Sequence, residues 1–268
     1  MSTLFDACAD AAVIAKRNVI KIRRVPEVLV FVLLSPIMFV LLFGYVFGSA
    51  IDLRGISYRE FLIAGIFAQT VVFGATFTGA GLAEDMQKGI IDRFRSLPMS
   101  RSAVLVGRTV SDIVYNVLSL GIMASTGFLM GWRIRTSLLE GIGGFVLLLL
   151  FAYAFSWVMA YIGLLVPSPE VVNNASFLVI FPLTFIADTF VPSQELPTVL
   201  RVFAEWNPVS SVTLATRQLF GNTIPSAASP DVWSLQHPGL YTLLWIALIL
   251  MVFIPLAVRR YQSASSRS

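Results

Sequence analysis

The sequence predicts an all-α membrane protein with six transmembrane helices, and three of its features lead to this fold class. Hydrophobic residues make up 57% of the 268 residues and charged residues only 13%, whereas soluble domains carry about 25% charged residues. The apolar residues come in blocks of about twenty, which is the length a helix needs to cross the ~30 Å hydrocarbon core of a bilayer. Lysine and arginine gather between alternate blocks, as they do in proteins that cross a membrane several times.

Residues 1–27 come before the first apolar block, and we expect them to form a helix that lies on the membrane surface. No proline or glycine interrupts the mixture of aliphatic and basic residues from Leu4 to Arg24. Such a helix can turn its basic face to anionic lipid headgroups and its apolar face to the interface. A soluble cytosolic tail is the alternative that the composition leaves open.

Six apolar segments between residues 28 and 258 are long enough to be transmembrane helices. They are residues 28–50, 61–82, 104–130, 142–166, 171–191 and 239–258. The first is too long for the apolar region of a signal peptide, so we expect it to be retained. The turn from Pro167 to Glu170 separates the fourth segment from the fifth, because proline interrupts a helix. Residues 259–268 remain as a short tail.

The distribution of basic residues predicts how the chain is oriented. In the six-span arrangement, 13 of the 19 lysine and arginine residues fall on the side of the two termini. The side richer in these residues is normally cytoplasmic, so we expect both termini inside the cell. The short loops and the lack of a targeting segment favour the inner or plasma membrane of a bacterium for this multi-pass protein.

Residues 192–238 form the longest stretch on the predicted outer side. Helix-start and helix-end signals, Asn207-Pro208 and Gly221-Asn222, divide this stretch. They predict two short helices, Leu196–Trp206 and Val209–Phe220. Because neither is a strongly amphipathic water-soluble helix, we expect both to lie against the outer leaflet.

The loop after the second apolar segment, residues 84–101, is short and densely charged. Glu84 and Lys88 stand four residues apart and could pair on a helix. An apolar face would come from Ile90, Ile91, Phe94 and Leu97, and Pro98 would end the helix. Such a helix suits docking to a soluble partner, whereas the alternative is a solvated connector between two spans.

This loop resembles the cytoplasmic loop of ATP-binding cassette (ABC) type 2 exporter permeases, the group that includes daunorubicin-resistance permeases. The resemblance lies in Glu84-Asp85, Lys88-Gly89 and the stretch from Arg93 to Arg101. The basic segment before the first span, Asn207-Pro208 and Arg217 extend it over nearly the whole chain. The resemblance implies a coupling helix that sits in a groove of an ATPase subunit. It implies ATPase-coupling roles for Glu84, Asp85, Lys88, Gly89, Arg93, Phe94, Arg95, Leu97, Pro98 and Met99.

The same resemblance implies how the protein is assembled and what it does. Two permease subunits, identical or homologous, would work with two copies of a separate ABC ATPase. They would move a hydrophobic drug, a lipid or a similar amphipathic compound outward through the lipid bilayer. The chain has no phosphate-binding loop of the form Gly-x-x-x-x-Gly-Lys-Ser/Thr. ATP and Mg²⁺ would therefore be bound by the partner, and this chain would be no enzyme by itself.

Other functional classes find little support in the sequence. One cysteine and one histidine, Cys8 and His237, cannot build a cysteine-histidine metal cluster. We find no motif of an intramembrane hydrolase or prenyl transferase. The formal net charge of +4 is explained by the topology of basic loops, so we expect no nucleic-acid partner. No cofactor is expected in this chain.

A substrate path is the least certain feature that the spans suggest. Polar and aromatic side chains share the second and fifth spans, where they could form an apolar, polarisable surface for an amphipathic substrate. The candidates are Gln69, Thr70, Phe73, Phe77, Asn173, Asn174, Phe177 and Phe181. Contact with lipid or packing between helices is the ordinary alternative for such phenylalanines. No residue identifies the substrate.

An ion-coupled secondary transporter is the alternative function. Such a protein would be expected to carry an ionisable residue at mid-span. Here Arg108 and Asp112, which could pair, lie near the inner start of the third span, and Asp188 lies near the outer end of the fifth. This distribution argues against ion coupling without excluding it, and dependence on ATP separates the two functions.

Overall fold

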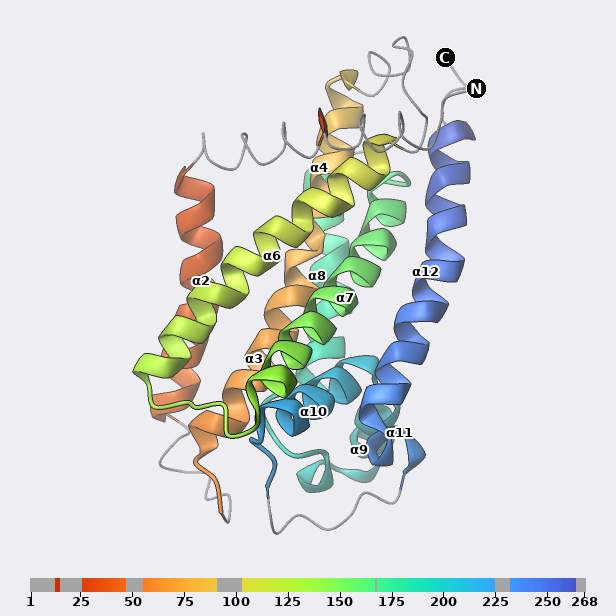
Figure 1. Ribbon diagram of the computed structural model, residues 1–268. Helices are drawn as coiled ribbons and strands as arrows, with labels where there is room; N and C mark the ends of the chain where they lie inside the picture. Colours follow the sequence, from red (N-terminus) through yellow and green to blue (C-terminus); the bar gives the residue numbers. More distant parts are fainter. Residues whose placement is uncertain are drawn as a thin grey trace.

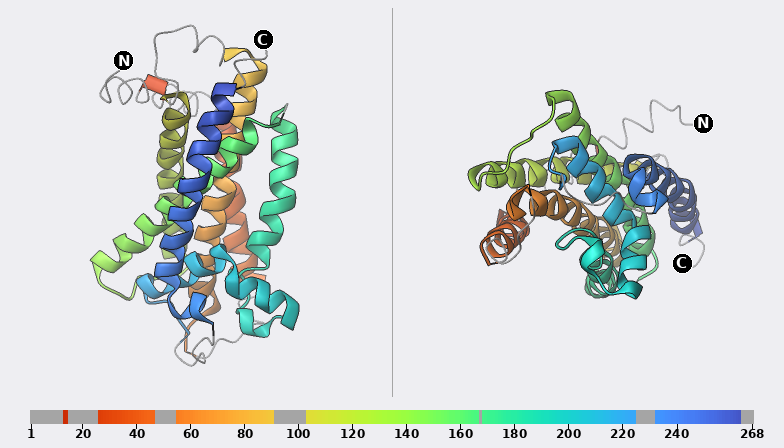
Figure 2. Two further views of the ribbon diagram at one scale, coloured as in Figure 1. Left: turned by 90° about the vertical axis from the view of Figure 1, so that its right-hand side faces the viewer. Right: turned by 90° about the horizontal axis from the view of Figure 1, so that it is seen from below.

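The computed structural model describes residues 13–14, 26–46, 55–90, 103–166, 168–224 and 232–263. Within these ranges the chain is helical, and no strand occurs. Long helices run side by side along one direction, and short helices gather at one end of them (Figure 1). Viewed along this direction, α2 stands at one side of the bundle and α12 at the other (Figure 2).

The described helices fall into two groups, those that run along the bundle, where α3 and α4 follow each other, and those that gather at one end of it. Those along the bundle are α2 (Pro26–Val46), α3 (Tyr58–Gly74), α4 (Thr76–Gln87), α6 (Ala103–Leu129), α7 (Leu138–Gly163), α8 (Pro169–Phe185) and α12 (Pro238–Ser263). Those at one end are the 3₁₀ helix η1 (Ser193–Glu195), α9 (Thr198–Trp206), α10 (Pro208–Phe220) and α11 (Trp233–Gln236). Helices α3 and α4 meet at Ala75 and together form one apolar stretch, Tyr58–Gln87.

Four stretches of the described chain are long and apolar enough to cross a membrane. They are Tyr58–Gln87, Val104–Leu129, Leu138–Gly163 and Pro238–Ser263. These overlap the second, third, fourth and sixth expected spans. Helices α2 and α8 lie over the first and fifth expected spans. Helix α8 has 17 residues and ends at Phe185, whereas the expected span continued to residue 191. The chain leaves the helix here because Asp188 and Thr189 bond to α10.

Local sequence signals explain where several helices begin and end. The Ser57 side chain accepts a hydrogen bond from the Glu60 amide and caps α3. Ser137 and Glu140 form a reciprocal capping box that starts α7. Asn207 caps α10, and Gly221 ends it with φ of 72°, a conformation that glycine adopts without strain. Helices α9 and α10 occupy the two segments where short helices are expected.

The core forms around α3, in which nearly every side chain is buried. Phe67 lies at its centre, with ring centroids 5.4 Å from Trp132, 5.7 Å from Phe145 and 6.1 Å from Phe220. Helices α4 and α7 approach closely at two glycines. A Cβ atom on Gly163 would lie 2.3 Å from the carbonyl oxygen of Gly79. Small residues thus permit helix contact at backbone distance, as is common in membrane proteins.

Candidate functional site

The end of α4 carries the first four of the ten expected coupling residues. Glu84 and Asp85 lie in the last turn of α4, and Lys88 and Gly89 follow it. The expected pair forms, with 2.5 Å between Lys88 Nζ and Glu84 Oε1. The hydrogen bond to Glu84 raises the pKa of the Lys88 ammonium group. Gly89 has φ of 64°, so the chain turns away from the helix in the left-handed region that favours glycine.

The other six expected coupling residues lie outside the described residues. They are Arg93, Phe94, Arg95, Leu97, Pro98 and Met99. The segment that contains them connects α4 to α6, which begins at Ala103. Any movement of this segment therefore acts first on α4 and α6.

Helices α4 and α6 are joined by polar side chains inside the bundle. The Thr78 hydroxyl donates to Asp112 Oδ2, and Arg108 Nη2 donates to the Phe77 carbonyl oxygen at 2.6 Å. Asn116 Nδ2 donates to the Asp112 carbonyl oxygen at 2.8 Å. The sequence suggested that Arg108 and Asp112 pair with each other. The hydrogen bonds of their side chains run to α4, because α4 packs against this face of α6, and the two charges also interact electrostatically.

Three of the eight candidate substrate-path residues come together on α8 and α3. The ring of Phe177 lies 6.3 Å from that of Phe73 and 5.0 Å from that of Phe181, measured between centroids. Phe181 then stacks on Phe185 at 4.0 Å. Phe177 and Phe181 are exposed on the surface of the chain. They form an aromatic face on α8.

The other five candidates lie elsewhere in the bundle. Gln69 and Thr70 are buried in α3, and Asn173 and Asn174 are exposed at the start of α8. Phe77 packs against Tyr115 of α6, with 5.4 Å between ring centroids. The eight residues therefore do not form one surface within a single chain.

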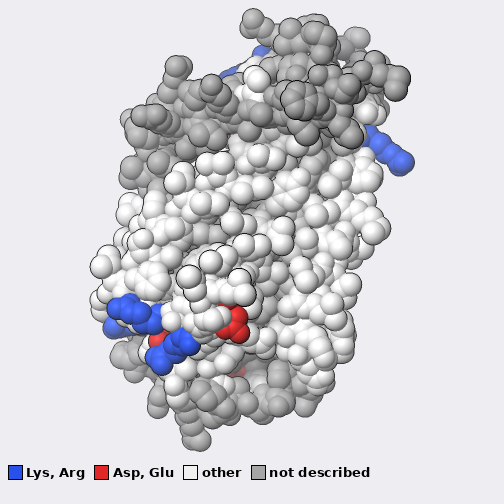
Figure 3. Space-filling view, in the orientation of Figure 1, with Lys and Arg blue, Asp and Glu red and all other residues white. Residues whose placement is uncertain are grey.

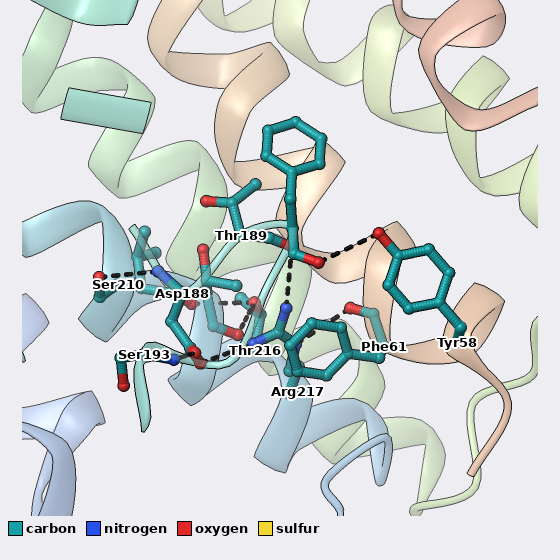
Figure 4. A network of polar contacts seen from close by, with 11 residues as sticks. Tyr58, Phe61, Asp188, Thr189, Ser193, Ser210, Thr216 and Arg217 are labelled. Atoms are coloured by element: carbon teal, nitrogen blue, oxygen red, sulfur yellow. Dashed lines mark hydrogen bonds and ion pairs between the residues drawn. The ribbon is translucent and has the colours of Figure 1, made fainter. Parts of the chain in front are cut away.

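A buried ion pair near the short helices was not anticipated by the sequence analysis. Arg217 of α10 is only 1% exposed, and its Nη1 lies 2.8 Å from Asp188 Oδ2 (Figure 4). Its Nε donates to the Phe61 carbonyl oxygen at 3.0 Å, and its Nη2 donates to the Thr189 carbonyl oxygen at 3.1 Å. The guanidinium also lies 3.4 Å from the centroid of the Phe61 ring.

Asp188 makes further hydrogen bonds with the backbone and with α10. Its Oδ1 accepts from the Ser193 amide at 2.8 Å, and its own amide donates to Ser210 Oγ at 3.0 Å. Nearby, the Tyr58 hydroxyl donates to the Phe190 carbonyl oxygen at 3.1 Å. A buried charge is tolerated when it is paired and hydrogen-bonded, as here. This network ties α10 and the chain after α8 to the start of α3.

Each member of this pair was visible in the sequence, but their pairing was not. Arg217 entered only through the family resemblance, and Asp188 only as a carboxylate near the end of a span. The two are 29 residues apart. The helical period relates residues three or four positions apart and cannot show that these two side chains meet. The sequence indicated only that each is a charged residue next to an apolar segment.

The surface of the chain is consistent with contact with lipid. In Figure 3, basic and acidic side chains lie together at the lower end of the described surface, and a broad band without described charged side chains separates them from a basic side chain near the upper end. Arg59, Arg133 and Arg135 lie at the lower end, where Arg135 pairs with Glu60 at 2.8 Å. Helix α12 exposes Leu240, Leu243, Leu244, Leu248, Met251 and Val252. These features are those of a multi-pass membrane protein.

No group of three or more histidine, cysteine, aspartate or glutamate residues that could hold a metal ion occurs in the part of the chain that the structure describes.

Comparison with known proteins gives a consistent result. Residues 10–220 match the family model described as ABC-2 type transporter. The chain is 30% identical over 250 residues to the daunorubicin resistance ABC transporter permease protein DrrB1 of Streptomyces coeruleorubidus, covering 93% of this chain and 85% of the relative.

Two further relatives are more distant. The chain is 24% identical over 233 residues to the probable doxorubicin resistance ABC transporter permease protein DrrC of Mycobacterium tuberculosis, covering 86% of this chain and 80% of that protein. It is 26% identical over 212 residues to the putative transport permease ycf38 of Pyropia yezoensis, covering 77% and 72%.

Proposed function

The chain belongs to the ABC-2 type transporter family, and we propose that it is the permease subunit of an ATP-driven exporter. The observation that carries this proposal is the match to the family model, which includes both the coupling segment and the helices on either side of it. Two relatives are named for resistance to daunorubicin and doxorubicin. A hydrophobic or amphipathic compound, such as an aromatic drug or a lipid, is therefore the proposed substrate class.

The proposed topology has six spans in a domain over residues 28–258, with both termini cytoplasmic in a bacterial inner membrane. The spans are α2, α3 with α4, α6, α7, α8 and α12, and residues 1–27 form an interfacial helix. Helix α8 has 17 residues, which at ~1.5 Å per residue is shorter than a bilayer core. The chain after it is buried against α10, which supports irregular backbone at this depth.

The short helices would lie on the outer side of the membrane. Helix α9 exposes Val199, Val202, Phe203 and Trp206. The ring of Tyr241 contacts two tryptophan rings, with 6.1 Å between its centroid and that of Trp206 and 5.9 Å to that of Trp233. Tryptophan and tyrosine are enriched where membrane meets water. These contacts support the proposal that α9 rests in the outer leaflet.

Energy would come from a separate ATPase subunit, which binds ATP and Mg²⁺. The segment after α4 is the proposed contact, with Glu84, Asp85, Lys88 and Gly89 at its near edge. Lys88 is the more exposed member of the Glu84–Lys88 pair, at 59% against 31% for the glutamate side chain. A charged, turned helix end suits docking into a groove of a soluble protein. Closure of two ATPase subunits would then reorient the spans.

A second permease subunit, identical or homologous, would cover the aromatic face of α8. This helix exposes Val171, Phe177, Leu178, Val179 and Phe181, and α2 exposes Leu34, Met38, Leu42, Tyr45 and Val46. The substrate would pass between the two copies. Phe177 and Phe181 would then line its path, and Asn173 and Asn174 would offer polar groups at the inner end of α8.

The test is purification of the tagged chain from its native membrane, followed by a vanadate-sensitive ATPase assay. We expect a stoichiometric ATPase subunit to co-purify with the wild-type chain. Combining Arg93→Glu with Phe94→Ala should abolish this association. The matched control is Arg133→Glu at the opposite end of the molecule, which should leave it unchanged. A chain that purifies alone, and supports proton-driven flux in vesicles, would instead establish the secondary transporter.

A further inference from the structure

Helices α4 and α6 meet along an antiparallel series of small and polar residues. A Cβ atom on Gly81 would lie 2.0 Å from Arg108 Nη2, so the guanidinium occupies the space left by that glycine. One turn further, Thr78 donates to Asp112. Beyond this, a Cβ atom on Gly74 of α3 would lie 2.9 Å from Asn116 Oδ1. Three successive turns of α6 are thus matched to successive turns of the α3–α4 stretch.

Of the two charged members of this series, Asp112 is buried inside the bundle and Arg108 is half-buried. Asp112 is 6% exposed and Thr78 is fully buried. A buried carboxylate is unfavourable unless it is hydrogen-bonded, and the Thr78 hydroxyl supplies such a bond to Asp112. Apolar side chains would pack two helices together equally well. Packing alone tolerates sliding and rotation, whereas directional hydrogen bonds define one register between two helices.

These contacts lie close to both ends of the proposed coupling segment. Helix α4 leads into the coupling segment and α6 leads out of it. Arg108 is in the second turn of α6, and it is bonded to the Phe77 carbonyl oxygen at 2.6 Å. A displacement of the coupling segment therefore reaches this contact before it reaches the rest of the bundle.

We propose that Thr78, Arg108 and Asp112, here named the α4–α6 clasp, make these two helices move as one rigid unit when the ATPase subunits close. The clasp residues are positioning residues, because they act through the helices and touch neither nucleotide nor substrate. This inference rests on the proposed exporter function. Without the clasp, α4 and α6 would slide past each other, and ATP hydrolysis would continue with less transport.

The experiment measures transported substrate per ATP hydrolysed, with the permease and its co-purified ATPase subunit reconstituted in liposomes. Thr78→Val removes the donor to Asp112 at nearly constant volume. Thr109→Val is the matched control, because Thr109 is also fully buried and its hydroxyl bonds within its own helix, to the Leu105 and Val106 carbonyl oxygens. Thr78→Ser should restore the clasp, and Asp112→Asn should weaken it from the other side.

We expect Thr78→Val and Asp112→Asn to lower the ratio of transport to hydrolysis several-fold while the ATPase subunit stays bound. Thr109→Val and Thr78→Ser should keep the wild-type ratio. A wild-type ratio in Thr78→Val overturns the clasp, as does a parallel loss of transport and hydrolysis, which would indicate a purely structural role. A wild-type chain that binds no ATPase overturns the exporter function itself, so the two failures are distinguishable.

Discussion

Arg217 and Asp188 form an ion pair with 2.8 Å between Nη1 and Oδ2, although 29 residues separate them in the chain. The pair joins α10 to the connection that follows α8, and Arg217 also reaches the Phe61 carbonyl oxygen of α3. Three separate parts of the chain are therefore held by one guanidinium. Because the pair is buried, removing either side chain would leave the other as an unpaired buried charge.

Replacing Arg217 by Gln should strongly destabilise the fold. The change leaves the Asp188 carboxylate buried without its cation, which lowers the free energy of unfolding by about 3–5 kcal/mol. Unfolding by denaturant in detergent micelles measures this. The control is Lys88→Gln, which removes an exposed i,i+4 pair with Glu84 at the end of α4 and should leave the free energy of unfolding nearly unchanged. Equal effects of the two changes would show that the buried pair contributes no more to stability than an exposed pair does.

Replacing Gly163 by Ala should disturb the contact between α4 and α7. The added Cβ would lie 2.3 Å from the Gly79 carbonyl oxygen, so the backbones must separate, with a loss of about 1–3 kcal/mol in the free energy of unfolding. Gly143→Ala in the same helix is the control, because its Cβ would meet only the Leu219 side chain at 3.9 Å. Similar thermal stability of the two variants would contradict this account of the α4–α7 contact.

Replacing Gly89 by Ala should weaken docking of the ATPase subunit. With φ of 64° at this position, a Cβ atom adds about 1–2 kcal/mol of backbone strain and favours a different path after α4. We expect several-fold weaker binding of the ATPase subunit, measured with the purified components. Gly121→Ala is the control, since nothing lies within 4 Å of the Cβ it would add. Unchanged affinity in Gly89→Ala would show that this turn does not orient the coupling segment.

Removing the rings of Phe177 and Phe181 should affect transport more than folding. Both are exposed on α8, so the double change to alanine should leave the thermal stability of the single chain nearly unchanged. If a second permease and the substrate path cover this face, transport and permease dimerisation should fall together. The matched control combines Leu244→Ala and Met251→Ala on α12, where both side chains are also exposed. Equal transport in the two double variants would assign the aromatic face to lipid.

Helix formation in this chain follows from local signals, and so it could be anticipated. The apolar blocks are long, and capping residues such as Ser137 and Asn207 act on amides only two or three positions away. The Glu84–Lys88 pair is of the same kind, because residues four apart on a helix are neighbours. The resemblance of residues 84–101 to the loop of ABC type 2 permeases could also be recognised from the sequence, because it depends only on the order of the residues.

The end of α8 could not be anticipated in this way. Residues 186–191 are apolar enough to continue the span, but Asp188 and Thr189 are bonded to α10. The contact of Thr78 with Asp112 joins residues 34 positions apart. Helical periodicity tells which residues share a face of one helix, but it does not tell which helix will face them.

The sequence by itself determined the helical class and the apolar segments of a membrane protein, and it predicts a coupling segment after the second span. The tertiary structure decided which apolar helices form the core and which polar residues meet. In the most apolar part of Tyr58–Gln87, 78% of the residues are buried within the chain, against 22% in that of Pro238–Ser263, although the second helix is the more apolar of the two. In a bilayer, contact with another apolar helix is little more favourable in free energy for an apolar side chain than contact with a lipid tail. Hydrophobicity therefore selects the spans but leaves their arrangement to close packing, glycine contacts and a few buried polar bonds.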